Sequence, residues 1–253
     1  MEKKMHLLHG DCLELMQTIG SNSVDLILCD LPYGTTACKW DTVIPFEPLW
    51  QQYERIIKDD GAIVLTAAQP FASILAVSNI KLFRYDWIYE KPNATGFLNA
   101  KKQPLRAHES VLVFYKKQPT FNPQKTYGHA RKSSHRNSVN SEVYGKAIKK
   151  TVYDSCDRYP RSVQVFESDK YKLNAHPTQK PLALMAYLVE TYSNRGDLVL
   201  DNCMGSGTTG VACVFTGRKF IGIEKDLKYF STARDRINTA KYENSFLEPN
   251  AAL

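Results

Sequence analysis

The sequence has no apolar run of the roughly 18 to 20 residues that a membrane-spanning helix needs. Two lysines stand in the first four residues, but no hydrophobic signal core follows them. Hydrophobic residues make up 43% and charged residues 23% of the chain, which are ordinary values for a folded domain and exclude disorder of the whole. These absences predict a globular protein that stays in the cytoplasm.

The sequence also lacks any Cys-x-x-Cys pair, although it contains six cysteines: Cys12, Cys29, Cys38, Cys156, Cys203 and Cys213. A structural zinc site uses ligands in such close pairs. Several of the cysteines, such as Cys29, lie within apolar runs. We therefore expect reduced, buried thiols and no metal.

Charge is present but unevenly distributed along the 253 residues, whose formal net charge is +7. Residues 96–172 contain 16 Lys and Arg against 6 Asp and Glu, a net charge of +10, while the remainder has a net charge of −3. The same segment carries aromatic side chains that could stack on bases: Tyr115, Phe121, Tyr127, Tyr144, Tyr153 and Tyr159. Such a localised excess indicates binding to a phosphate backbone, the alternative being a solvated basic loop region.

Outside this segment, short apolar runs alternate with helical patterns. The expected strands are 5–8, 24–29, 62–66, 84–90, 110–115, 198–200 and 219–223. The expected helices are 13–18, 45–58 with Gly61 ending it, 71–78, 181–189, 208–215 and 226–239. This alternation predicts a doubly wound α/β fold, with polar residues 116–175 as an insertion that does not build the sheet.

A glycine-rich turn joins the expected strand 198–200 to the next helix. Gly205, Gly207 and Gly210 match G-x-G-x-x-G, where glycine allows a tight turn and a close approach to a ligand. Glu224 ends the following strand, where a carboxylate can accept hydrogen bonds from both ribose hydroxyls. The pattern predicts an adenosine-containing cofactor, either a dinucleotide or S-adenosyl-L-methionine.

A second motif, Asp30-Leu31-Pro32-Tyr33, ends the expected strand 24–29. Ligands of open α/β sheets bind outside these strand ends. Asp30 can accept a hydrogen bond from an exocyclic amine, Pro32 leaves neighbouring carbonyls free to accept from the same amine, and Tyr33 offers a face for stacking a base. The motif therefore predicts a site that holds a nucleobase by its amino group.

With these motifs the chain resembles the amino-methylating DNA methyltransferases, the adenine-N6 and cytosine-N4 enzymes that use S-adenosyl-L-methionine. Their catalytic motif, Asp/Asn/Ser-Pro-Pro-Tyr/Phe, is similar to residues 30–33, with Leu31 replacing the first proline. Their cofactor motif, Asp-Pro-Phe-x-Gly-Ser-Gly-Thr-Thr, is similar to residues 201–209, with departures at Asn202 and Cys203. A third match is the run His176-Pro177-Thr178-Gln179-Lys180-Pro181.

The order of the motifs resembles the permuted beta class of this family. The resemblance implies one Rossmann-like methyltransferase domain over 1–253, with a catalytic half 1–115, a basic target-recognition insertion 116–172 and a cofactor half 173–253. It implies catalysis by Asp30, Leu31, Pro32 and Tyr33. It implies that the cofactor contacts Asp11, Cys12, Thr178, Lys180, Asp201, Cys203, Gly205, Ser206, Gly207, Thr208 and Glu224, with Lys180 near the methionine carboxylate.

The implied reaction is methyl transfer to the N6 amine of an adenine in double-stranded DNA. Asp30 and a backbone carbonyl would accept the amine protons and expose its lone pair, without a metal or a covalent cysteine. The base must first be flipped out of the duplex, and residues 91–97 and 101–106 are candidates for handling that strand. The expected DNA-binding residues are Lys101, Lys102, Arg106, Lys125, Arg131, Lys132 and Arg136.

Several alternatives stay open at this point. Cytosine-N4 methylation uses the same scaffold, although Ser often replaces Asp in the tetrad of those enzymes, so Asp30 favours adenine. A glutamine methyltransferase would not need the basic insertion, and an NAD oxidoreductase explains the glycine turn alone. A catalytically inactive DNA-binding module would fail to bind the cofactor. The family is compatible with a homodimer and with a partner restriction endonuclease.

Overall fold

The computed structural model describes residues 5–35, 38, 41–136, 139–142, 145–147, 151–167 and 179–247. The chain divides into two compact units. We call residues up to 122 together with those from 162 onward the core unit, and residues 123–161 the insert unit.

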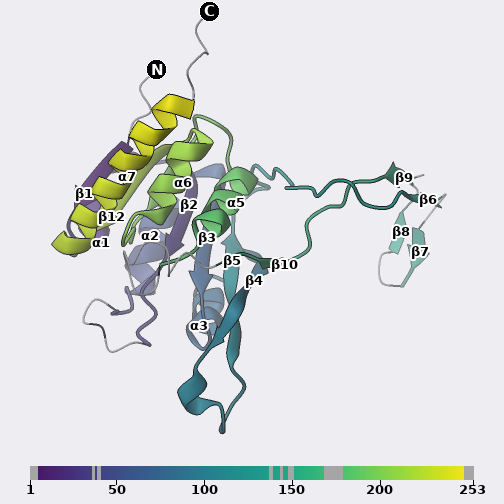
Figure 1. The fold of residues 1–253 in the computed structure, drawn as a ribbon, viewed down its shortest axis with the longest axis horizontal. Coiled ribbons are helices and arrows are strands. Elements are labelled where there is room, and N and C mark those ends of the chain that lie inside the picture. Colours follow the sequence, from purple (N-terminus) through teal and green to yellow (C-terminus); the bar gives the residue numbers. More distant parts are fainter. Residues whose placement is uncertain are drawn as a thin grey trace, which may run out of the picture. The chain divides into compact units, whose positions relative to one another are not determined.

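The core unit is built on an eight-stranded sheet (Figure 1). Its strands, in spatial order, are β1 (Met5–His9), β12 (Lys219–Glu224), β11 (Leu198–Asp201), β2 (Val24–Asp30), β3 (Ile57–Ala67), β5 (Arg106–Phe114), β4 (Phe83–Thr95) and β10 (Val163–Val165). The strands from β1 to β3 are parallel, β5 is antiparallel to both neighbours, and β10 is parallel to β4. The mostly parallel sheet confirms the predicted fold class.

Helices cover both faces of this sheet, as a doubly wound fold requires. One face packs against α1 (Cys12–Leu15), the 3-10 turn η1 (Met16–Thr18), α2 (Phe46–Ile56) and α3 (Phe71–Ser78). The other face packs against α5 (Leu182–Tyr192), α6 (Thr208–Thr216) and α7 (Leu227–Leu247). Alternate residues of β2 enter the two cores, with Leu26 and Leu28 on one side and Ile27 and Cys29 on the other.

Gly61 does not end a helix, contrary to the expectation from the sequence. The helix α2 ends at Ile56, and Gly61 lies inside β3. A Cβ at Gly61 would stand 2.9 Å from the carbonyl oxygen of Asp25 on β2. The glycine therefore permits close pairing next to a register shift between Val24 and Leu26.

The β4–β5 hairpin extends well past the other strands of the sheet (Figure 1). Its connection contains the 3-10 turn η2 (Phe97–Asn99). Phe97 is 78% and Leu98 84% exposed at this tip. The hairpin thus presents two large apolar side chains to solvent.

The insert unit holds two small antiparallel ribbons. Strand β6 (Lys132–Arg136) pairs with β9 (Thr151–Ser155), and β7 (Val139–Ser141) pairs with β8 (Gly145–Ala147). The unit is narrower than the predicted insertion 116–172. The expectation that residues 116–175 add nothing to the main sheet is wrong, because β10 within this segment pairs with β4. Strand β10 has only three residues, which are too few to show a strand pattern in the sequence.

The cysteines are free thiols, but the prediction that they are buried holds only in part. Cys29 and Cys213 are buried, whereas Cys38 and Cys156 are exposed because they lie in connecting segments rather than in the core elements. Within the described residues, no helix has the length and apolar character to cross a membrane.

Candidate active site at the carboxyl ends of the parallel strands

A cavity of about 920 Å³ opens at the carboxyl ends of the parallel strands. Four carboxylates at or just after these ends line it: Asp11, Asp30, Asp201 and Glu224. The start of α5 and the base of the β4–β5 hairpin complete the wall. The structure therefore brings the tetrad and the glycine turn, which are about 170 residues apart in the chain, into one cavity.

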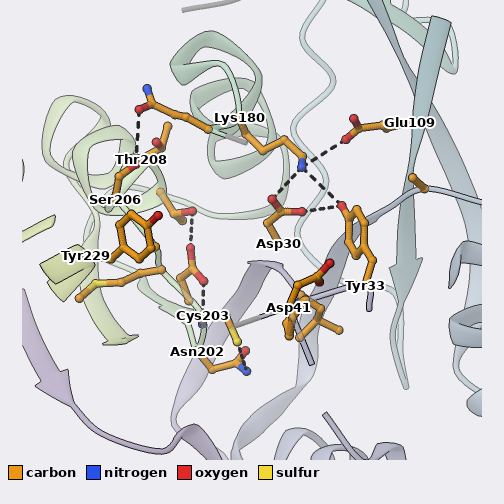
Figure 2. Close-up of a pocket in the computed structure, with 18 of the residues that line it drawn as sticks. Asp30, Tyr33, Asp41, Glu109, Lys180, Asn202, Cys203, Ser206, Thr208 and Tyr229 are labelled. Carbon is orange, nitrogen blue, oxygen red and sulfur yellow. Dashed lines mark hydrogen bonds and ion pairs between the residues drawn. The ribbon is translucent and has the colours of Figure 1, made fainter. Parts of the chain in front are cut away.

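Asp30 is held by three side chains, of which Figure 2 shows Tyr33 and Lys180. Its Oδ1 accepts hydrogen bonds from Tyr33 Oη at 2.5 Å and from Thr66 Oγ1 at 2.5 Å. Its Oδ2 accepts one from Lys180 Nζ at 2.7 Å. Thr66 lies on the neighbouring strand β3 and is the residue that pairs with Asp30 in the sheet register. The carboxylate is thus fixed in orientation by groups from three separate segments.

Tyr33 lies between the carboxylate and an aromatic neighbour. Its ring stacks on Phe71 with centroids 5.1 Å apart. Burial and the nearby charge of Asp30 raise the pKa of Tyr33 well above its ordinary value, so the phenol keeps its proton and donates it. Asp41 fixes the loop that follows, because its carboxylate accepts from the N–H groups of Gly34 and Thr35 at 2.8 and 2.9 Å. Leu31, by contrast, points into the core and is buried.

Lys180 connects two carboxylates. Besides Asp30, its Nζ lies 3.2 Å from Oε2 of Glu109 on β5, and Lys91 lies 3.4 Å from the other oxygen of Glu109. Burial alone would lower the pKa of Lys180, but Asp30, Tyr33 and Glu109 raise it well above its ordinary value. Burial alone would raise the pKa of Glu109, but Lys180 and Lys91 hold it below its usual value. Both groups are therefore charged.

The glycine turn takes a backbone form that needs glycine. Gly205 and Gly207 have φ values of +50° and +81°, in the left-handed region. A Cβ at Gly207 would also meet the Cβ of Ala233 on α7 at 2.9 Å. The turn delivers the chain into α6, and its backbone lines the cavity at Gly205.

Asp201 ends β11 and is 3% exposed. It accepts hydrogen bonds from the N–H of Cys203 at 3.1 Å and from Thr209 Oγ1 at 2.6 Å. Burial raises its pKa to about 7, and the hydrogen bond from Thr209 only partly offsets this. Asp201 therefore titrates near neutral pH.

Glu224 and Asp11 also line the cavity. Glu224 accepts from the N–H groups of Gly205 and Asp226 at 2.9 and 2.8 Å, and burial raises its pKa. Asp11 caps α1 through the N–H of Leu13 at 2.9 Å. Burial raises its pKa, but the hydrogen bonds from Lys225 and Leu13 outweigh this and lower it.

Cys12 and Cys203 form a thiol-lined part of the same cavity. A hydrogen bond from Cys203 lowers the pKa of Cys12, against the effect of burial. The neighbouring Asn202 is buried and accepts a hydrogen bond from Tyr53 Oη at 2.6 Å. The two departures from the family motif are thus packed against α1 and α2.

The described residues of the predicted cofactor set all reach the cavity except Gly207, which lies in the turn behind it. Thr178 lies outside the described residues, as do His176 and Pro177. Among the predicted DNA-binding residues, Arg106 lines the cavity, while Lys101 and Lys102 are exposed on the hairpin. The others belong to the insert unit: Lys125, Arg131, Lys132 and Arg136.

Sequence reasoning missed four residues that shape the site: Asp41, Thr66, Glu109 and Tyr53. Thr66 and Tyr53 act through neighbours far away in the chain, and Asp41 binds the loop just before it, but no local motif marks these three residues. Glu109 had a signal, since it is a lone acidic residue two positions before the apolar run 111–114. A charge beside a run of that kind needs a partner when buried.

The chain is similar to known methyltransferases in sequence and in fold. The family model described as DNA methylase matches residues 24–235. The chain is 31% identical over 255 residues to DNA adenine methyltransferase YhdJ of Escherichia coli (strain K12), covering 93% of this chain and 83% of that protein. It is 29% identical over 272 residues to Type II methyltransferase M.HinfI of Haemophilus influenzae, covering 93% and 68%.

Two solved structures share the fold. The M1.HpyAVI–SAM complex superposes with a TM-score of 0.65 at 26% identity and covers 92% of this chain and 99% of that one. The cytosine-N4-specific PvuII DNA methyltransferase gives a TM-score of 0.64 at 17% identity over 94% and 91%. The matched family segment includes both strand-end motifs, so the chain belongs to the DNA methylases, the family that its sequence resembles.

Proposed function

We propose that this protein transfers the methyl group of S-adenosyl-L-methionine to the N6 amine of a flipped-out adenine in double-stranded DNA. One observation carries the proposal. The Asp30 carboxylate, fixed by Tyr33, Thr66 and Lys180, opens into the same cavity as the glycine turn and Glu224. An acceptor for an amine and a binding site for an adenosine cofactor thus line the same cavity.

The residues present fit this cofactor. Glu224 lines the cavity, and each of its carboxylate oxygens accepts one backbone N–H and retains a lone pair that can accept from a ribose hydroxyl. Among the described residues, the buried Nε2 of Gln179 has no hydrogen-bond partner, which leaves a donor in the wall for an anionic group such as the methionine carboxylate. Asp11, Cys12 and Cys203 line the remaining side.

The bound cofactor would supply an electrophilic methyl group. The chain's own task is then to orient the amine and to strengthen it as a nucleophile. Asp30, held by hydroxyl groups on Oδ1, can accept an amine proton through Oδ2 and draw the nitrogen toward tetrahedral geometry. Preorganised acceptors of this kind need no rearrangement during the reaction. Tyr33, backed by Phe71, offers an aromatic face for the extruded base.

Adenine is favoured over cytosine as the target. Asp30 stands where serine often stands in cytosine-N4 enzymes. The relative YhdJ is named as a DNA adenine methyltransferase, although the fold is shared with the cytosine-N4-specific PvuII enzyme. Cytosine-N4 methylation is the second candidate.

Two surfaces would bind the DNA. Lys101, Lys102 and Arg106 lie on the β4–β5 hairpin, whose tip exposes Phe97 and Leu98. Apolar side chains beside cations suit a duplex whose bases must be unstacked.

In the insert unit, Lys132 and Arg136 are exposed on β6. They are four residues apart on a strand and therefore share one face of the β6–β9 ribbon. Arg131 is instead paired with Asp154 through two hydrogen bonds of 2.8 and 2.6 Å. Action on cellular DNA would place the protein in the cytoplasm.

Nucleoside analysis tests the proposed reaction. The protein is incubated with unmethylated double-stranded DNA and methyl-tritiated S-adenosyl-L-methionine, and the DNA is digested to nucleosides. We expect the label in N6-methyl-2′-deoxyadenosine. Label in N4-methyl-2′-deoxycytidine would establish the second candidate, and unlabelled DNA together with absent cofactor binding would identify a DNA-binding module without activity.

A further inference from the structure

Both carboxylate oxygens of Asp30 already accept hydrogen bonds in this structure. Oδ1 accepts from two hydroxyl groups and Oδ2 accepts from the ammonium of Lys180. An amine that approaches Oδ2 therefore competes with a buried cation, since the side chain of Lys180 is only 9% exposed. Oδ2 keeps a second lone pair for the amine, but an ammonium that stays on this oxygen weakens it as an acceptor, so methyl transfer is favoured when the ammonium moves away.

Glu109 offers the ammonium another place. Its Oε2 is buried and lies 3.2 Å from Lys180 Nζ, yet among the described residues this oxygen has no hydrogen bond of good geometry. Figure 2 shows Lys180 pointing between Asp30 and Glu109. A buried carboxylate oxygen that lacks a hydrogen bond is costly, and a small shift of the ammonium would satisfy it.

We propose that Glu109 is a positioning residue that receives the Lys180 ammonium when the target amine binds to Asp30. This inference rests on the proposed function. In the free protein, Lys180 occupies one acceptor site of Asp30 Oδ2 and keeps the carboxylate oriented. As the base enters, the ammonium moves from Asp30 Oδ2 to Glu109 Oε2, and no proton is transferred in this step.

The other contacts of Asp30 are less suited to this exchange. Tyr33 and Thr66 both donate their single hydroxyl proton to Oδ1, and their hydroxyl oxygens lie 3.3 Å apart, so moving one disturbs the other. Lys180 has a flexible four-carbon side chain and a second carboxylate within reach. Because its pKa is raised well above the ordinary value, Lys180 stays charged and does not act as a base.

The test compares Glu109→Gln in two backgrounds. Glutamine keeps the shape but removes the charge that attracts the ammonium. We expect the single-turnover methylation rate to fall about 100-fold, the size of effect seen when one preorganised electrostatic group is lost. The affinity for S-adenosyl-L-methionine should stay within about twofold, because Glu109 acts on the amine side of the cavity.

The second background is Lys180→Met, in which no ammonium has to move. There the same Glu109→Gln change should cost less than about threefold, although Lys180→Met itself lowers activity. A residue that merely supports the fold would cost the same in both backgrounds, and that result would overturn the proposal. Glu109→Asp should restore part of the rate, and Glu90→Gln, an exposed carboxylate on β4, serves as the matched control.

A crystal structure decides the matter if Lys180→Met is too slow to measure. In wild-type protein bound to its DNA and S-adenosylhomocysteine, Lys180 Nζ should lie closer to Glu109 than to Asp30. An ammonium that remains on Asp30 Oδ2 with the base in place would refute the exchange. If wild-type protein does not methylate DNA at all, the proposed function fails; if it does, an equal cost in both backgrounds removes only this inference.

Discussion

Charged side chains are used in opposite ways in the cavity and on the β6–β9 ribbon. In the cavity, Lys180 and Glu109 are largely shielded from water, Asp30 is partly shielded, and Lys180 pairs with both carboxylates. On the ribbon, Lys132 and Arg136 are exposed. Buried charges respond to protonation and to the loss of one partner, whereas exposed charges respond mainly to salt. Chemistry and DNA affinity should therefore be separable by experiment.

The largest effect is expected from the cavity. Asp30→Ala should lower the methylation rate at least about 1,000-fold, because the amine loses its carboxylate acceptor and Lys180 loses its nearer carboxylate partner. Binding of S-adenosyl-L-methionine, measured by calorimetry, should persist. The exposed Asp60→Ala is the control. Near-normal turnover by Asp30→Ala would contradict the assignment of the catalytic carboxylate.

A second effect comes from pH. Burial raises the pKa of Asp201 to about 7 in the folded chain, from an ordinary value of 3.8 for an aspartate in water. Between these values the folded chain holds a proton that the unfolded chain has lost, so the free energy of unfolding should fall by about 1.4 kcal/mol for each unit of rising pH. Above pH 7 this contribution levels off.

Chemical denaturation from pH 5 to 8.5 measures this slope. Asp201→Asn should lack it, while the exposed Asp60→Asn should keep it. A wild-type curve parallel to that of Asp201→Asn would show that Asp201 does not titrate in this window.

The smallest effect is expected on the ribbon. Lys132→Ala and Arg136→Ala should each weaken DNA binding a few-fold and reduce the slope of log affinity against log salt by about 1, as lost phosphate contacts do. Lys241→Ala, an exposed lysine on α7, is the control. An unchanged slope in both variants would place the DNA-binding surface elsewhere. A strong pH dependence of DNA affinity would mean that the ribbon responds to protonation as the cavity does.

The sequence predicted the parts of the site that are continuous in the chain. The tetrad at Asp30 and the glycine turn before α6 both carry local patterns, and the fold rule for strand ends brings them together. Thr66 carries no such pattern, because its role depends on the pairing of β3 with β2, and the single charge before an apolar run that marks Glu109 does not identify its partner. Gly61 was misread since glycine ends helices more often than it relieves crowding between strands.

The pairing of β1 with β12 has a consequence for how the protein forms. Met5 pairs with Phe220 and His9 with Glu224, so β1 finds its neighbour only after β12, about 215 residues later in the chain, has been made. Contacts this distant in sequence close slowly. Asp11 and Glu224 cannot line one cavity before that closure. The cofactor-binding part of the cavity is therefore among the last features to form, and a partly synthesised chain would not bind the methyl donor.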